Sequence, residues 1–245
     1  MKCISCGANS RRGKNKHRSL ITPHFSLLFL YFCLISLSIP AQTSWRDSLS
    51  ILSRQIELQP KSVDLRLRKA AVNIELGQWD YAAEEYGRVL EMDSHCPAAL
   101  FFRAYVNVHQ RRYELAQADY EHLLRLVPRH FDARLGLAVT LQHLGKEAEA
   151  LDQLNILVET APDSASAYAA RASIEQQKRL YVPALYDWEQ ALTLRPDELE
   201  YQLGQYATLC AMYRRRDAQR MEQQLKARGV PQATLKQLKK EAKRK

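Results

Sequence analysis

The amino-acid sequence predicts an all-α fold in which antiparallel helix pairs stack as a solenoid. Three observations support this prediction: the composition, the recurrence of residue types at a fixed interval, and the helical spacing of apolar residues. The chain has 245 residues, and only 8 of them are glycine. Leu, Ala, Glu, Gln and Arg are abundant, and such a composition favours helices over sheets.

Residue types recur every 34 positions along most of the chain. One column holds Pro60, Pro128, Pro162 and Pro196, with Ser94 in the missing place. Two columns hold alanine: Ala70, Ala104, Ala138 and Ala172, and Ala82, Ala116, Ala150, Ala184 and Ala218. A fourth column holds large side chains: Tyr86, Tyr120, Leu154 and Trp188. A recurrence of this length indicates stacked units, because one such unit cannot bury its apolar face alone.

Each unit is predicted to be a helix, a short turn and a second helix. Its apolar residues lie three or four positions apart, as they do on one face of a helix. Gly77 and Gly145 are placed to end a first helix in the left-handed conformation. Pro183 falls in the first turn of a second helix, where its missing N–H costs nothing. The alanine columns allow two helix axes to approach to about 8 Å.

These features together resemble the tetratricopeptide repeat, whose Gly-x-aromatic turn is matched by Gly77-Gln78-Trp79. The resemblance implies a right-handed α-solenoid with repeats at 63–96, 97–130, 131–164 and 165–198. The sequence departs from the family pattern at Arg111 and Arg179, where Gly is usual, and at Glu147, where an aromatic residue is usual.

The segments on either side of the repeats are predicted to be helical as well. Residues 42–62 read as a half-repeat helix that ends at Pro60, and residues 199–229 as a degenerate capping repeat. Residues 230–245 read as a basic C-terminal helix or tail. Tyr206 stands in the small-residue column of the capping repeat, so we expect no further repeat to dock there in the usual way.

The first 41 residues read as a secretory signal. Residues 1–24 carry six basic residues and no acid, residues 25–39 are apolar, and Ala41 suits a cleavage site. We therefore expect an exported protein, either periplasmic or secreted. A bacterial envelope is favoured over an ER lumen, because the chain has no N-x-S/T sequence. An uncleaved anchor formed by residues 25–39 is the alternative, although this stretch is short for a membrane span.

The charge of the remaining chain is small and uneven. Without the leader the formal charge falls from +9 to +3, with −5 over residues 42–198 and +8 over 199–245. This distribution does not indicate a nucleic acid partner. The basic tail is interpreted either as a solvated cap of the solenoid or as a weak contact with an anionic membrane surface.

Oppositely charged residues recur sixteen positions apart in three repeats: Lys69 with Glu85, Arg103 with Asp119, and Arg171 with Asp187. In the third repeat both positions are neutral, Leu137 and Gln153. A half-buried charge without its partner is costly. The joint variation therefore predicts ion pairs that hold the two helices of a repeat together.

The sequence contains no recognisable catalytic or metal-binding motif. It has no H-E-x-x-H, no G-x-S-x-G and no phosphate-binding glycine loop, so we expect no enzyme, cofactor or metal. Cys96 and Cys210 stand more than three repeats apart, which is roughly 30 Å in a solenoid. This separation excludes a disulfide between them.

The resemblance implies that the first helices of the repeats line a concave groove. On this basis the groove residues are Leu67, Arg68, Phe101, Phe102, Tyr105, His109, Leu135, Val139 and His143. The aromatic residues of the second repeat are the expected anchors for a peptide or helix, and Arg68 and the two histidines the polar contacts. Core packing of the two phenylalanines is the alternative. The fourth repeat offers a small, smooth surface: Ser166, Ala169, Ala170 and Ser173.

The sequence therefore predicts a non-catalytic scaffold or adaptor that holds a peptide or helix of a partner protein in its groove. The alternative is a structural subunit of a cell-envelope assembly. Such a subunit would contact its neighbours through its outer faces and its basic tail, and the groove would have no role.

Overall fold

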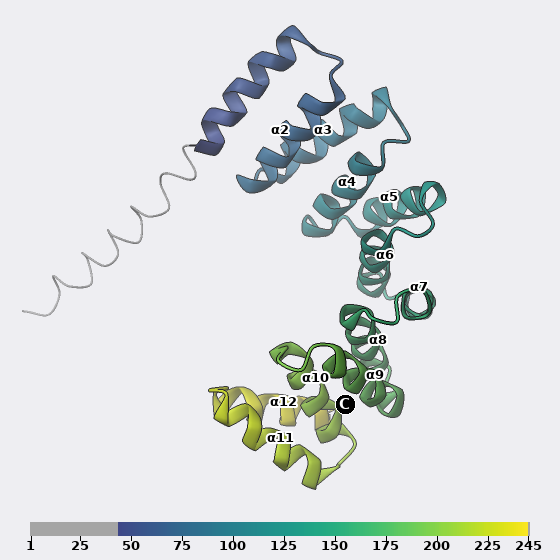
Figure 1. The fold of residues 1–245 in the computed structure, drawn as a ribbon, viewed down its shortest axis with the longest axis vertical. Helices are drawn as coiled ribbons and strands as arrows, with labels where there is room; N and C mark the ends of the chain where they lie inside the picture. The colour runs from purple at the N-terminus through teal and green to yellow at the C-terminus, as the bar shows by residue number, and fades with distance from the viewer. Residues whose placement is uncertain (1–43, 245) are drawn as a thin grey trace, which may run out of the picture. The chain divides into compact units, whose positions relative to one another are not determined.

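A computed structural model describes residues 44–244, and every regular element in this range is a helix (Figure 1). Residues 44–58 are helical and precede the regular pairs. The predicted secretory signal and the alternative anchor, residues 1–41, lie outside the described residues. Among the helices of the described range, none is long and apolar enough to cross a membrane.

The pairs begin at residues 63, 97, 131, 165 and 199, a constant step of 34. The helices are α2 (Val63–Glu75), α3 (Trp79–Met92), α4 (Pro97–His109), α5 (Tyr113–Leu126), α6 (Phe131–His143), α7 (Glu147–Thr160), α8 (Ala165–Gln177), α9 (Tyr181–Leu194), α10 (Leu199–Ala211), α11 (Arg215–Ala227) and α12 (Gln232–Arg244). The all-α solenoid of helix pairs is thus confirmed.

The turns inside the pairs repeat one backbone conformation. The second residue after each first helix has a positive φ: 68° at Gly77, 58° at Arg111, 72° at Gly145, 61° at Arg179 and 56° at Tyr213. Arg111 and Arg179 therefore take the conformation that the glycines take. A side chain in this region costs about 1–2 kcal/mol. The packing of the two helices on either side of the turn offsets this cost.

The first helix of several pairs starts at a side-chain cap. Ser62 and Ser164 accept a hydrogen bond from the backbone N–H three residues on, at 3.4 Å in both cases. His130 Nδ1 does the same for Ala133 at 3.2 Å. Such caps satisfy a backbone donor that the helix itself leaves free. Cys96 occupies the equivalent place before α4 and is buried.

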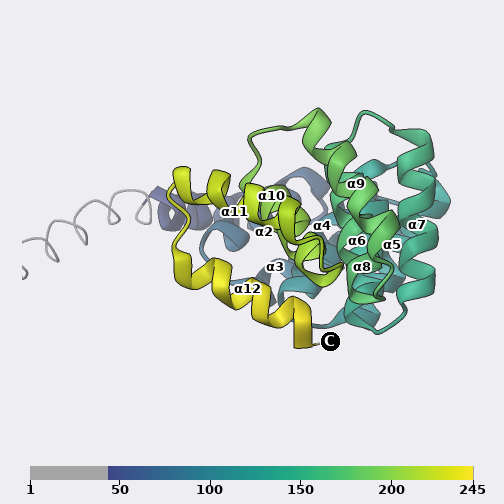
Figure 2. The same ribbon diagram turned by 90° about the horizontal axis from the view of Figure 1, so that it is seen from below.

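The helices form an inner row and an outer row. Each first helix packs against its own partner, and α4, α6, α8 and α10 also pack against the second helix of the pair before. The first helices α2, α4, α6, α8 and α10 also touch one another in succession. In Figure 2, α5 and α7 lie to the right of α4, α6 and α8. The first helices are therefore the inner row, where a groove between successive pairs would lie.

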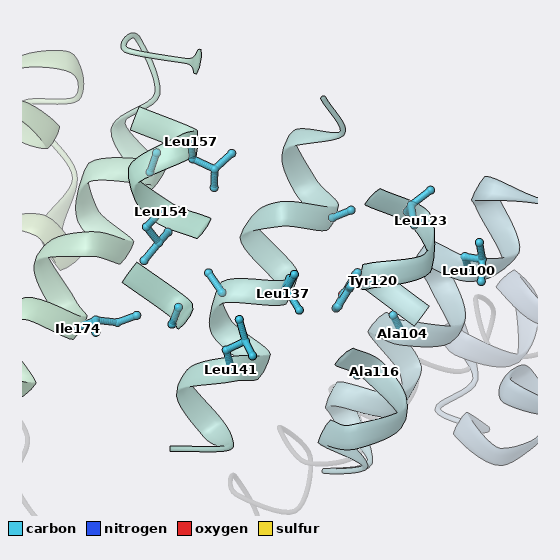
Figure 3. Packing of buried hydrophobic residues seen from close by; sticks show 14 residues of the cluster. Leu100, Ala104, Ala116, Tyr120, Leu123, Leu137, Leu141, Leu154, Leu157 and Ile174 are labelled. Carbon is cyan, nitrogen blue, oxygen red and sulfur yellow. The ribbon is translucent and has the colours of Figure 1, made fainter. Parts of the chain in front are cut away.

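The core runs between the two rows, and the alanine columns lie at its centre. Ala104, Ala138 and Ala172 are fully buried at equivalent places in successive pairs. Figure 3 shows Ala104 in one cluster with large residues such as Tyr120, Leu154 and Ile174. Small residues at the crossings let the helices approach closely, so the burial of the columns explains the 34-residue period.

Two glycines of the inner row let an aromatic ring pack directly on a helix. A Cβ added at Gly136 would lie 2.6 Å from Tyr120 Cζ, and one added at Gly204 would lie 2.5 Å from Trp188 Cζ2. Both rings come from the second helix of the preceding pair. Thr140 and Thr208 donate hydrogen bonds to the carbonyls of these glycines at 2.7 and 3.0 Å. The same arrangement thus recurs every second repeat.

The C-terminal helix α12 packs mainly on α10 (Figure 2). Leu235 is buried in a cluster with Tyr206 and Leu225, and the Tyr206 hydroxyl donates to the Leu235 carbonyl at 3.5 Å. A regular first helix would pack against the second helix before it, here α11. Here α12 packs on α10 instead, next to the bulky Tyr206. Its position therefore differs from that of a repeat helix.

Candidate functional site

Ion pairs connect the two helices within several pairs. Lys69 Nζ lies 2.9 Å from Glu85 Oε1. Arg103 binds both oxygens of Asp119 at 2.8 and 2.6 Å, and Arg171 binds both oxygens of Asp187 at 2.6 and 2.9 Å. The three carboxylates are buried, whereas the basic side chains keep partial contact with solvent. These acids lie buried between the two helices of a pair, as a structural role requires.

A second set of arginines was not anticipated from the sequence. Arg66 donates to Glu85 at 2.8 Å and to the Pro60 carbonyl at 2.9 Å. Arg134, two repeats later, donates to Gln153 at 2.7 Å and to the Pro128 carbonyl at 2.6 Å. Burial by itself would raise the pKa of Glu85, but the hydrogen bonds from Lys69 and Arg66 outweigh it and lower that pKa. The two arginines lie 68 residues apart, which is two repeats, and this recurrence is the sequence signal that could have revealed them.

Glu175 is the one half-buried acid of α8 that these networks leave unsatisfied. Its Oε2 atom is buried and has no hydrogen-bond partner. Burial, followed by the negative charge of Asp187, raises the pKa of Glu175 to about 7, although Arg171 acts in the opposite direction. The folded state therefore holds this proton at a pH where the unfolded chain has lost it.

We expect the stability of the protein to fall as the pH rises from 4.5 to about 7, through this group. Below that range Glu175 is protonated in both states, and above it the folded state must ionise an unsatisfied acid. Glu175→Gln should remove the loss and stabilise the protein by about 1 kcal/mol at pH 8, allowing for solvent screening. Urea unfolding at several pH values measures the effect. Glu189→Gln, at an exposed position, is the control, and identical pH profiles for the two variants would refute the expectation.

The predicted groove residues of α2 and α4 lie at different depths. Leu67 is half-buried against the core, and Arg68 is exposed with its guanidinium 3.8 Å from Asp64. Phe101 packs on the core and stacks on His130 at 5.3 Å between ring centroids. The aromatic side chains most open to solvent on α4 are Phe102, 42% exposed, and Tyr105, 38% exposed. The aromatic surface of α4 is therefore narrower than the sequence suggested.

The two histidines of the predicted groove stack on aromatic residues of the preceding pair. His109 lies 4.6 Å from Trp79 with an interplanar angle of 8°, and His143 lies 4.6 Å from Tyr113 with an angle of 11°. Both histidines are exposed to solvent. They join successive repeats at the turn end of the inner row. Within residues 44–244, no three His, Cys, Asp or Glu side chains form a group that could hold a metal ion.

A cleft with a volume of about 310 Å³ opens between α6, α8 and α10. The sequence predicted a smooth surface for the α8 part of it. Instead, the small residues of α8 form a hollow between larger neighbours. The lining residues are Leu135, Ala138, Val139, Gln142, Leu154, Ser166, Ala169, Ala170, Ser173, Ile174, Trp188, Glu200 and Tyr201. Two predicted groove residues, Leu135 and Val139, thus form part of its wall.

Family models and several known proteins are similar to parts of this chain. Models described as tetratricopeptide repeat match residues 67–116 and 108–174. A DnaJ homolog subfamily C member 7 homolog from Dictyostelium discoideum is 22% identical in an alignment 206 residues long, which covers 64% of this chain and 38% of that protein. The human peptidyl-prolyl cis-trans isomerase FKBP4 is 28% identical over 106 residues, 42% of this chain and 23% of that one. This chain therefore spans well under half the length of these relatives.

Solved structures show the same fold at low sequence identity. The Pseudomonas aeruginosa protein pilF has a TM-score of 0.68 at 20% identity, covering 85% of this chain and 95% of that one. YrrB, described as a TPR protein with an unusual peptide-binding site, has a TM-score of 0.63 at 19% identity. That match covers 77% of this chain and 97% of YrrB. These likenesses show the fold, an all-α solenoid of helix pairs.

Proposed function

We propose that the tetratricopeptide repeats of this chain form a non-catalytic scaffold whose inner helices bind a peptide or helix of a partner protein. Proteins with such repeats commonly mediate protein–protein interactions, and the fold is generally a scaffold without catalytic activity. The description of YrrB as having a peptide-binding site supports the same use of this fold. The partner would lie along the inner row of first helices.

The observation that carries the proposal is the pair of exposed aromatic side chains on α4. Phe102 and Tyr105 leave 42% and 38% of their surface open to solvent on an inner helix. Phe102 is backed by Tyr86 at a centroid distance of 5.9 Å, and Tyr105 is backed by His109 at 4.5 Å. Rings that are held in place on one side and open on the other lose little entropy on binding. They suit the anchors of a protein interface.

The polar groups around these rings would orient the bound segment. Arg68 extends from α2 on one side, and His109 and His143 lie at the turn end of α4 and α6. The imidazole nitrogens and the guanidinium provide donors for main-chain carbonyls or acidic side chains. A segment crossing α2, α4 and α6 would meet all three groups.

The function is tested by replacing both anchors with alanine. Phe102→Ala with Tyr105→Ala should reduce the recovery of bound partner proteins from a host extract at least tenfold, as expected for loss of two hot-spot residues. Circular dichroism should show unchanged helicity. The matched control is Tyr81→Ala with Tyr186→Ala, two exposed aromatics on outer helices. Equal recovery by the anchor variant and the unmodified protein would refute the proposal.

We also propose that the mature protein is exported, because residues 1–41 have the layout of a secretory signal. Intact-mass measurement of the protein recovered from its host tests this. A mature form that begins near residue 42 supports export by cleavage. A full-length form found only with membranes supports the anchor at residues 25–39, and a full-length soluble form contradicts both.

A structural role in an assembly is the second candidate, and the outer helices favour it. Tyr81, Val182 and Tyr186 are 63%, 70% and 58% exposed on α3 and α9. Deleting residues 230–245 is an unsuitable test, because Leu235 of α12 is buried against α10. Lys236→Glu with Lys240→Glu changes only exposed charges of the tail. Release of the protein from its assembly by this variant, with the α4 variant still attached, would favour the second candidate.

A further inference from the structure

We infer that the cleft between α6, α8 and α10 is a second subsite, which takes a bulky apolar side chain that is followed or preceded by a cationic residue. The inference rests on the proposed function, since the residue would belong to a protein segment bound along the inner row. It adds the chemistry of the partner. None of the α4 anchors lines this cleft, so the two sites can be tested separately.

The shape of the cleft follows from small residues between large ones. Ser166, Ala169, Ala170 and Ser173 of α8 lower its centre, while α6 and α10 raise its sides with Leu135, Val139 and Tyr201. A volume of about 310 Å³ accommodates one large aliphatic or aromatic side chain with its adjoining backbone. The hollow is open to solvent on an inner helix row, so a bound chain can reach it from the groove.

The base of the cleft is apolar because of how Trp188 is held. Gly204 permits the indole ring to lie against α10, where a Cβ would be 2.5 Å from Cζ2. The indole N–H donates to Gln176 Oε1 at 3.4 Å, and the same oxygen accepts from Thr208 at 2.8 Å. The polar atom of the ring is thus engaged within the protein. Trp188 therefore lines the cleft with the carbon atoms of its ring.

The charge of the cleft lining determines which partner residue is favoured next to the bound apolar side chain. Glu200, which is exposed, is the one charged residue among those that line the cleft. The other polar residues of the lining, Gln142, Ser166 and Ser173, are neutral. An acidic ligand would be repelled by Glu200, and a lysine or arginine would be attracted to it. The lining is therefore complementary to an apolar residue next to a cation.

Trp188 allows the inference to be measured directly. In a variant with Trp45→Phe and Trp79→Phe, the remaining tryptophan is the one that lines the cleft. Acetylated and amidated pentapeptides with a central leucine flanked by lysines should change its fluorescence in a saturable way. The same peptide with a central glycine should bind at least about tenfold more weakly, the value of one buried aliphatic side chain. The leucine peptide flanked by glutamates should bind about threefold more weakly at low salt.

Two variants assign the signal to the cleft. Ser173→Leu fills it from α8 and should abolish the saturable change. Glu200→Lys, at an exposed position, should reverse the preference between the lysine and glutamate peptides, whereas Glu189→Lys on the outer helix α9 should not. Equal binding of all three peptides, or no saturable change up to about 5 mM, the range expected for one anchor residue, would overturn the subsite. Partner capture that still depends on Phe102 and Tyr105 in that case would leave the proposed function standing.

Discussion

Arg171→Met should lower the free energy of unfolding by about 3–5 kcal/mol, because it leaves Asp187 charged and buried without its partner. The Asp187 side chain is only 1% exposed and receives two hydrogen bonds from Arg171. Neither oxygen can reach water in compensation. Urea unfolding followed by circular dichroism measures the loss.

The double variant Arg171→Met with Asp187→Leu is the control for this expectation. Replacing a buried pair with apolar residues of similar volume is close to neutral, so most of the lost stability should return. The third repeat also lacks the charged pair, with Leu137 in the basic position and the neutral Gln153 in the acidic one. If the double variant were as unstable as Arg171→Met, the uncompensated carboxylate could not be the cause.

Gly204→Ala should destabilise the protein by about 1–3 kcal/mol, although alanine is the better helix former. The new Cβ would lie 2.5 Å from the Trp188 ring, which is only 5% exposed and is held by the hydrogen bond from its indole N–H to Gln176. Overpacking of this kind costs more than the roughly 1 kcal/mol that alanine gains over glycine in a helix. Thermal and urea unfolding both report the change.

Two comparisons separate this clash from a general effect of alanine. Gly87→Ala places its Cβ 3.9 Å from the nearest atom, Arg103 Nη1, and should leave stability unchanged or raise it by up to about 1 kcal/mol. Gly204→Ala with Trp188→Leu copies the Leu154 and Ala170 pair of the neighbouring repeat and should recover part of the loss. Equal destabilisation at both glycines would contradict the packing seen at Gly204.

The repeat and its pairs were predictable because they depend on spacing alone. A 34-residue step fixes which residues are equivalent, and the small residues of the Ala104 column must then lie at equivalent crossings. The partners of Arg103 and Arg171 followed from variation within the chain itself. These ion pairs join the two helices of one pair, which follow one another directly in the sequence. The domain boundaries and the predicted export of the protein from the cytoplasm stay predictions.

The cleft and the histidine stacks were not predictable, because they depend on three-dimensional contacts between different repeats. The small residues of α8 predicted a smooth surface, whereas the depth of the hollow is set by neighbours on α6 and α10. His109 was expected to face the groove freely, and its stack on Trp79 depends on the relative rotation of two pairs. Gly136 and Gly204 show the same limit: their role appears only when a ring from another helix is placed against them.

The central claim is that the inner row of first helices is the surface that meets the partner. Site-specific photocrosslinking in the host tests it most directly, with a photoreactive phenylalanine analogue at Phe102 or Val139 of the inner row and at Tyr81 or Tyr186 of the outer row. All four side chains are at least 36% exposed, so access to solvent does not bias the comparison. The account predicts one shared adduct from both inner positions and none of it from the outer ones. The same adduct from the outer positions alone would contradict it.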